Sequence, residues 1–354
     1  MDRATASPRN NSPTFRRIRT LAVLLTLVGI GLFGYFIYAV GFEEIVNGIG
    51  RFGIAGFGVI LAIYFVRLCL RSYAWTLSVH EPAALRMQDA LPAVVIGEAL
   101  SSTIPLGILI SGTSKAIVVR KRLPLVAGLS SVATENLFYS LVTGIFLIFG
   151  AGVLIRQFGL DSDLRFAIDM LIAALGVLII LGVVMVIRQW HFASATVGWL
   201  YRAGLLHERL APFRDEVRRF EDLIYGFYRR YPRRFLPICG LEALYHVLGI
   251  AEIWFILFRL GEALTTPLNA FLLESVSRLV TILFKLVPFV VGVDEAGAQF
   301  VGETVGLGAG IAVTLAIIRK GRMLVWTAVG ALLIAKRGFS PSHISGALDR
   351  ERPN

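Results

Sequence analysis

The sequence predicts an all-α polytopic membrane protein, and three observations support this fold class. Hydrophobic residues make up 56% of the 354 residues, charged residues make up 17%, and the mean hydropathy is +0.72. Such a composition is unusual for a soluble protein. Several apolar runs approach or exceed the ~20 residues that cross a hydrocarbon core as a helix. Basic residues flank these runs, as they do in the cytoplasmic loops of membrane proteins.

The apolar runs define the expected helices. In chain order they cover residues 18–40, 53–79, 124–155, 166–188, 235–260, 267–291 and 307–335. The first run is longer than the apolar part of a signal peptide and has no convincing small-residue cleavage site after it. We therefore expect an uncleaved helix there. Because two segments contain breaks, we expect about six full transmembrane helices and two re-entrant helical hairpins.

The first broken segment covers residues 88–122, where Pro105, Gly107 and Gly112 interrupt the helix and basic residues follow from Lys115 onward. A single crossing would place these cations outside the cell. A hairpin that enters from the cytoplasm and returns keeps them inside. Broken backbone at membrane depth is tolerated only where protein buries it or where it lines a cavity.

The second broken segment covers residues 267–306, with breaks at Pro288, Gly292 and Asp294. Here a hairpin from the outer face keeps the C-terminus cytoplasmic. The halves at 18–155 and 166–336 then each hold an odd number of full crossings, so the second half is inverted. The two hairpins are oppositely oriented. Inverted repeats with broken helices are typical of transporters, whose site lies near the membrane midplane.

The distribution of arginines predicts the topology. Arg16, Arg17 and Arg19 place the tail at 1–17 in the cytoplasm, and the arginine-rich segment at 190–234 is cytoplasmic as well. Residues 208–230 predict an amphipathic helix, which either lies on an anionic membrane face or simply connects two crossings. The tail at 337–354 is cytoplasmic. The net charge of +11 is explained by these loops, so we expect no nucleic acid partner.

Four motifs in the same order resemble the lysylphosphatidylglycerol synthase transmembrane family, whose members are flippase-like membrane domains. Residues 288–297, PFVVGVDEAG, resemble its P-x-x-x-G-V-x-E-x-G signature. Arg71 to Trp75 resembles the R-x-x-x-W of the second helix. Residues 105–122 resemble its first hairpin, and Arg319 matches the basic residue of the last helix.

The resemblance implies the lipid-translocating region without the soluble aminoacyl-transferase domain, and a hopanoid-associated subgroup is compatible with it. One departure stands out. The family's first hairpin usually carries Gly-Glu before its basic residue, whereas this chain has Gly112-Thr113. Glu98 is a candidate to replace that carboxylate.

Ionisable residues within apolar segments are candidates for substrate binding, because a charge at membrane depth is costly and is usually retained for function. The candidates are Asp294, Glu295, Arg319, Arg278, Lys285, Lys115, Glu135, Asn136, Glu98 and Arg71.

Several candidates also have a structural explanation. Asp294 and Glu295 either bind a cationic head group or cap a half-helix. Arg319 either neutralises a hairpin carboxylate or binds a lipid phosphate. For the Arg319–Arg322 segment as a whole, Asp294, Glu295 and Arg278 are then the expected partners. Lys320 and Arg322 then reach only the cytoplasmic surface. Alternatively, the helix ends near Ile318 and all these cations are interfacial.

Other charges are expected to pair within helices. Glu274 and Arg278 are four residues apart, which favours an ion pair, and Lys285 lies two turns further along the same face. Lys115 is either a phosphate contact or a cytoplasmic anchor. Glu135 and Asn136 interrupt an apolar helix and predict a pairing or substrate role.

Glu242 and His246 share a helix face and form either a proton relay or structural hydrogen bonds. Arg67 and Arg71 also share a face. Arg71 can reach the inner interface, whereas Arg67 is deeper and needs a partner.

These patterns predict a lipid flippase-like transporter that moves or binds a phospholipid or isoprenoid-type lipid head group. Two alternatives remain, an intramembrane lipid-modifying enzyme and a non-catalytic membrane partner of a lipid synthase. We find no catalytic, metal or nucleotide motif, so we expect no cofactor and no enzyme activity. Cys69 and Cys239 fall within helices and are expected to be small core residues. The expected location is a bacterial inner membrane.

Overall fold

The computed structural model describes residues 42–103, 107–159, 161–202, 214–261, 265–284, 292–307 and 309–336, together with Tyr38 and Val290. In these ranges the chain forms eleven helices and no strands, which confirms the all-α prediction. Apart from Tyr38, the predicted first helix at 18–40 lies outside the described residues. Both predicted tails, at 1–17 and 337–354, also lie outside them.

The long helices of the described chain are α2 (Phe42–Leu77), α5 (Leu125–Gln157), α6 (Ser162–Arg188), α10 (Pro232–Leu260) and α13 (Ala309–Lys336). Four of them contain a stretch long and apolar enough to cross a membrane, in α2, α5, α6 and α10. Helix α13 has comparable length but carries the Arg319–Arg322 charges. The chain is therefore a multi-pass membrane protein.

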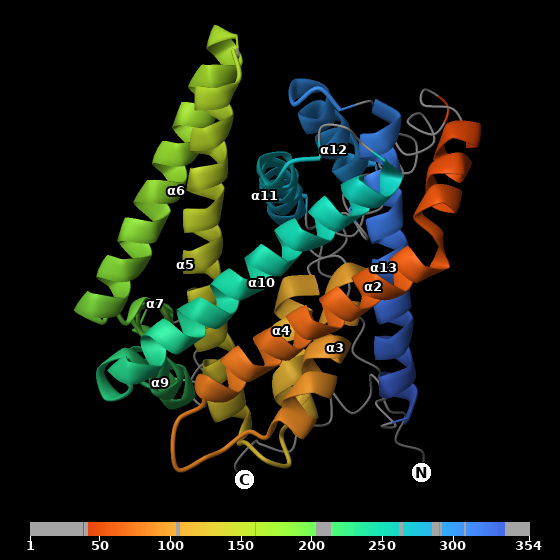
Figure 1. Ribbon diagram of the computed structural model, residues 1–354. Helices are drawn as coiled ribbons and strands as arrows, with labels where there is room; N and C mark the ends of the chain where they lie inside the picture. The colour runs from red at the N-terminus through yellow and green to blue at the C-terminus, as the bar shows by residue number, and fades with distance from the viewer. Residues whose placement is uncertain are drawn as a thin grey trace, which may run out of the picture.

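Two pairs of short helices occupy the segments that the sequence predicts to be hairpins. Helix α3 (Met87–Thr103) packs on α4 (Gly107–Val118), and α11 (Pro267–Leu283) packs on α12 (Val293–Thr304). Figure 1 shows these pairs toward opposite ends of the molecule. The connecting residues, 104–106 and 285–289, lie outside the described residues.

The remaining helices surround these pairs. Helices α2 and α10 pack along one another and cross the centre of the view in Figure 1, with α5 and α6 on one side and α13 on the other. Helix α13 contacts both α3 and α12. It therefore links the two short-helix pairs.

Helix α2 begins eleven residues earlier than the apolar run at 53–79 predicts, and its axis is kinked at Gly53. Gly53 has φ 70° and ψ 168°, a conformation that L side chains rarely adopt. Arg259 of α10 donates a hydrogen bond of 3.1 Å to the Phe52 carbonyl beside the kink. The kink separates the polar first part of α2 from the apolar part that crosses the centre.

Helices α7 (Phe192–Arg202) and α9 (Arg214–Arg230) lie in the described part of the arginine-rich segment. Glu221 of α9 accepts hydrogen bonds from the backbone N–H groups of Ala193 (2.7 Å) and Ser194 (3.1 Å), and so caps the start of α7. The apolar side of α9 packs on α5 and α10, where Phe227 is buried. This arrangement favours the connector interpretation of the amphipathic helix.

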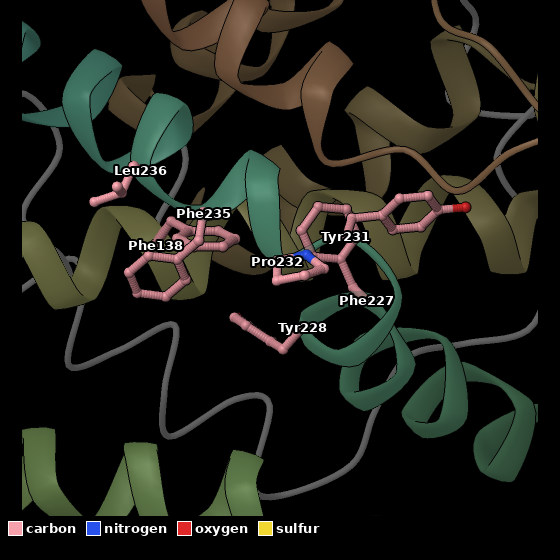
Figure 2. A pocket seen from close by; sticks show the side chains of 7 residues that line it. All are labelled: Phe138, Phe227, Tyr228, Tyr231, Pro232, Phe235 and Leu236. Carbon is pink, nitrogen blue, oxygen red and sulfur yellow. The ribbon is translucent and has the colours of Figure 1, made fainter.

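A small apolar cavity of about 200 Å³ lies at this junction. Figure 2 shows that α5, α9 and the start of α10 contribute its walls. The lining residues are Phe138, Phe227, Tyr228, Tyr231, Pro232, Phe235 and Leu236. Its lining contains no charged side chain, so it is distinct from the buried charges described next.

Candidate functional site

Charged side chains from four helices meet in the interior. Arg67 of α2, Glu252 of α10 and Glu274 of α11 have no exposed surface, and Arg319 and Arg322 of α13 are also buried. Arg278 of α11 lies at the edge of the same group. We call these six residues the central arginine cluster.

Two carboxylates connect the cluster. Glu274 accepts from Arg319 Nη2 at 2.8 Å, from Arg278 Nη2 at 2.9 Å and from Arg67 Nη2 at 3.2 Å. Glu252 accepts from Arg67 Nη1 at 3.1 Å and also pairs with Arg322. Four guanidinium groups thus share two carboxylates, which leaves a formal excess of two positive charges.

Aromatic rings cover part of this charge. The Arg67 guanidinium lies 4.2 Å from the centre of the Tyr245 ring, and that of Arg322 lies 4.0 Å from the centre of the Tyr64 ring. Desolvated cation–π contacts of this kind contribute about 2 kcal/mol. The tyrosines therefore help to retain arginines that the carboxylates do not fully neutralise.

Gly249 allows the cluster to assemble. It faces α11 from the middle of α10, and a Cβ atom at this position would overlap with the Glu274 carboxylate and approach Arg67 Nη2 to 3.0 Å. Only a residue without a side chain leaves room for Glu274 between the two helices.

A second group of charges lies beside the first. Arg71 of α2 donates to Glu135 Oε1 of α5 from Nη2 at 2.8 Å and from Nε at 3.1 Å, and Asn136 Oδ1 lies 3.5 Å from the same Nη2. Glu135 and Glu242 of α10 are both buried, as is Lys115 of α4. We call Glu135 and Glu242 the carboxyl pair.

A third group holds the start of α12. Lys320 of α13 pairs with Glu295 Oε1 at 3.0 Å, lies 3.9 Å from Asp294 Oδ2, and donates to the Val290 carbonyl at 3.3 Å. Glu295 Oε2 also accepts from the backbone N–H of Gly292 at 2.8 Å. The capping role predicted for Glu295 is therefore confirmed.

Ser277 connects the third group to the central arginine cluster. Its hydroxyl accepts from Arg319 Nη1 at 2.9 Å and donates to Asp294 Oδ1 at 2.9 Å. The signature carboxylates and the arginines of α13 therefore belong to one continuous network.

The structure brings most candidate residues together and decides the predicted pairings of the Arg319–Arg322 segment. Arg319 pairs with Glu274 of α11, which confirms the prediction that it neutralises a carboxylate of the segment 267–306. Lys320 pairs with Glu295 and lies 3.9 Å from Asp294, as expected for the Arg319–Arg322 segment. Arg322 is buried and pairs with Glu252. The prediction that Lys320 and Arg322 reach only the surface is therefore wrong. Helix α13 also continues through these residues to Lys336 instead of ending near Ile318.

Further predictions have mixed outcomes. The Glu274–Arg278 pair and the buried partners of Arg67 are confirmed. The suggestion that Arg71 reaches the inner interface is wrong, because Glu135 holds it in the interior.

The other predicted positions are placed as follows. Glu98 accepts from the Tyr64 hydroxyl at 3.1 Å. His246 Nε2 lies 3.0 Å from the Thr143 hydroxyl, in agreement with a structural hydrogen bond. Lys285 lies outside the described residues.

Glu252, Tyr64 and Tyr245 were not among the sequence candidates. Glu252 had a detectable signal, since it interrupts an apolar helix in the same way as Glu135. The tyrosines had none, because aromatic residues are common in membrane helices. Within the described ranges no three histidine, cysteine or acidic side chains gather as a metal site.

Comparison with protein families gives a match to the model of the lysylphosphatidylglycerol synthase TM region over residues 20–330. The matched segment contains all three charged groups. The comparisons with curated proteins and with solved structures gave no match.

Proposed function

We propose that this chain, a member of the lysylphosphatidylglycerol synthase TM-region family, is a flippase-like transporter that translocates a phosphate-bearing lipid head group between leaflets. The proposed substrates are anionic phospholipids and isoprenoid-type lipid phosphates. The central arginine cluster is the proposed binding site for the phosphate, and the lipid tails stay in the bilayer.

The observation that carries this proposal is the excess of arginine in the central arginine cluster. A buried charge is costly unless it is paired and hydrogen-bonded. Among the described side chains, the Nε groups of Arg67, Arg319 and Arg322 have no hydrogen-bond acceptor. A phosphate has several acceptor oxygens and suits the planar fork of arginine. Bound phosphate would reduce the excess positive charge and accept hydrogen bonds from these donors.

The helix pairs α3–α4 and α11–α12 support a mechanism of exchange. We propose that they are re-entrant hairpins of an inverted repeat and that their motion gives the phosphate access to the central arginine cluster. In the state that the structure shows, which we call the enclosed state, Glu252 and Glu274 form ion pairs with the arginines that would bind the phosphate. When the α11–α12 pair moves relative to α13, phosphate replaces a carboxylate, and the reverse motion releases it to the other leaflet.

A translocation assay tests the proposal. The protein is reconstituted in liposomes with fluorescent phosphatidylglycerol, and the label reaching the opposite leaflet is quantified by quenching from outside. We expect Arg319→Gln and Arg322→Gln to slow translocation at least about ten-fold, since each loses a charge-assisted contact worth roughly 1.5–3 kcal/mol. Arg218→Gln, on the exposed side of α9, is the control. Equal rates in all four proteins would refute the proposal.

The same assay separates transport from lipid chemistry. We propose that the chain has no enzyme activity, so the lipid mass spectrum should be unchanged after the assay. A new lipid species that disappears in Glu135→Gln or Asp294→Asn would instead support an intramembrane enzyme.

A non-catalytic partner role makes a different prediction. In that case the 190–234 segment would hold a lipid-synthesis enzyme, and synthesis in cells would survive the loss of every charge in the central arginine cluster. For the topology, we propose cytoplasmic N- and C-termini in a bacterial inner membrane, which accessibility labelling of introduced cysteines would test.

A further inference from the structure

The carboxyl pair contains buried oxygens that the described side chains leave without a donor. Glu242 has no exposed surface and Glu135 has only 1%. Arg71 binds Glu135 Oε1, whereas Glu135 Oε2 and both Glu242 oxygens receive no hydrogen bond within the described part of the chain. Helices α5 and α10 pack together here, and one turn further along each helix the Tyr139 ring lies 6.0 Å from the Tyr245 ring. Glu135 and Glu242 therefore face each other across this contact and interact directly.

Two ionised carboxylates cannot share this position favourably. Both are acceptors, so they offer each other no hydrogen bond, and their like charges repel strongly in an apolar interior. One proton removes both problems. A protonated carboxyl group donates an O–H···O⁻ bond to the other carboxylate, which is among the stronger hydrogen bonds in proteins.

We propose that Glu135 and Glu242 form a proton-binding site and share one proton in the enclosed state. The proton resides on a Glu242 oxygen and is hydrogen-bonded to Glu135 Oε2, while Arg71 stabilises the remaining negative charge at Oε1. Release transfers one proton to water and leaves two carboxylates, which Arg71 and Lys115 then neutralise. No other reactant is consumed.

Titratable groups from several helices surround this site. Arg71 of α2, Lys115 of α4, Tyr139 of α5 and Cys239 of α10 interact with the pair directly. Glu98 of α3 lies near Lys115, and Tyr245 and His246 of α10 lie near Arg71. His246 is turned toward Thr143 and is not part of the carboxyl pair.

Tyr245 connects the proton site to the central arginine cluster. Its ring lies 4.2 Å from the Arg67 guanidinium and 5.8 Å from that of Arg71. A proton on the carboxyl pair adds one positive charge beside the cluster and favours an anion there. By linkage, a bound anion favours the proton to the same extent. This coupling rests on the proposed function, and it predicts that a proton moves in the same direction as an anionic lipid.

Infrared spectroscopy tests the proton site without any transport measurement. The protein is placed in nanodiscs and titrated with acid and base while the C=O stretching band of protonated carboxyl groups is recorded. We expect the wild type to retain such a band at neutral pH, where exposed carboxyl groups are ionised. The band should disappear in Glu242→Gln and in Glu135→Gln, and remain in Glu216→Gln on the exposed side of α9. A wild-type spectrum without the band, or a band that persists in both pair variants, would overturn the proposal.

Liposomes with a pH gradient test the coupling. We expect the gradient to shift the steady-state distribution of fluorescent phosphatidylglycerol in the wild type and to have no effect in Glu242→Gln, which mimics the protonated acid. An unchanged response in that variant would overturn the coupling. If the wild type moves no lipid at all, the transport proposal fails, whereas the infrared band still decides whether the proton site exists.

Discussion

Arg319 of α13 and Glu274 of α11 form an ion pair of 2.8 Å between residues that are 45 positions apart in the chain. Glu274 also forms ion pairs with Arg67 of α2 and with Arg278 of its own helix. One buried carboxylate thus holds three helices together. Its removal is the most direct test of how the interior charges stabilise the fold.

We expect Glu274→Gln to lower the free energy of unfolding by about 3–5 kcal/mol, because it leaves buried guanidinium groups without their counter-charge. Thermal unfolding in a fixed detergent measures the effect. Glu303→Gln, on the exposed part of α12, is the matched control and should change stability by less than about 0.5 kcal/mol. Similar unfolding temperatures for both variants would contradict this role of Glu274.

Gly249→Ala tests the close approach of α10 and α11. The added methyl group would overlap with the Glu274 carboxylate, so we expect a loss of about 1–3 kcal/mol of stability. Gly240→Ala is an internal control on the same helix, because a Cβ atom there meets no other atom within 4 Å. Alanine is the better helix former, so that variant should be neutral or more stable by up to about 1 kcal/mol.

Lys320→Met should loosen the start of α12. Lys320 binds Glu295 and the carbonyl of Val290, a non-glycine residue with φ 49°. Such a conformation persists only where the surroundings hold it. We expect faster hydrogen exchange at residues 292–296, measured by mass spectrometry, and no change with Lys336→Met at the end of α13. Unchanged exchange in Lys320→Met would show that other contacts hold this turn.

His80, in the connection between α2 and α3, should make stability fall in acid. Burial lowers the pKa of His80, and the positive charges of Arg230 and Arg234 lower it further. The unfolded chain therefore binds a proton at His80 more readily, so its contribution to stability is present above the unfolded pKa of about 6.5. This contribution to stability is lost as the pH falls from about 6.5 through the lower pKa that His80 has in the folded protein.

Unfolding temperatures measured from neutral to mildly acidic pH test this prediction. We expect the acid-induced decrease to be smaller in His80→Gln than in the wild type. His191→Gln, whose ring pairs with Asp222 on the exposed side of α9, serves as the control. An identical pH dependence in the wild type and His80→Gln would refute the prediction.

The sequence by itself determined that the chain is helical, that it crosses a membrane several times, and which family it resembles. Apolar run length, the flanking arginines and the order of motifs contain this information because they are local properties. The Glu274–Arg278 pair was predictable for the same reason, since residues four apart on a helix are neighbours.

Only the tertiary structure decided which partner each buried charge takes. Arg319 and Lys320 are adjacent in the chain, but a helix turns about 100° per residue, so they face different elements. Arg319 meets Glu274 of α11, and Lys320 meets Glu295 of α12. Arg322, three residues on, returns to the Arg319 side and pairs with Glu252 of α10. A single sequence does not reveal which helices lie on each side of α13, and that packing selects the partners.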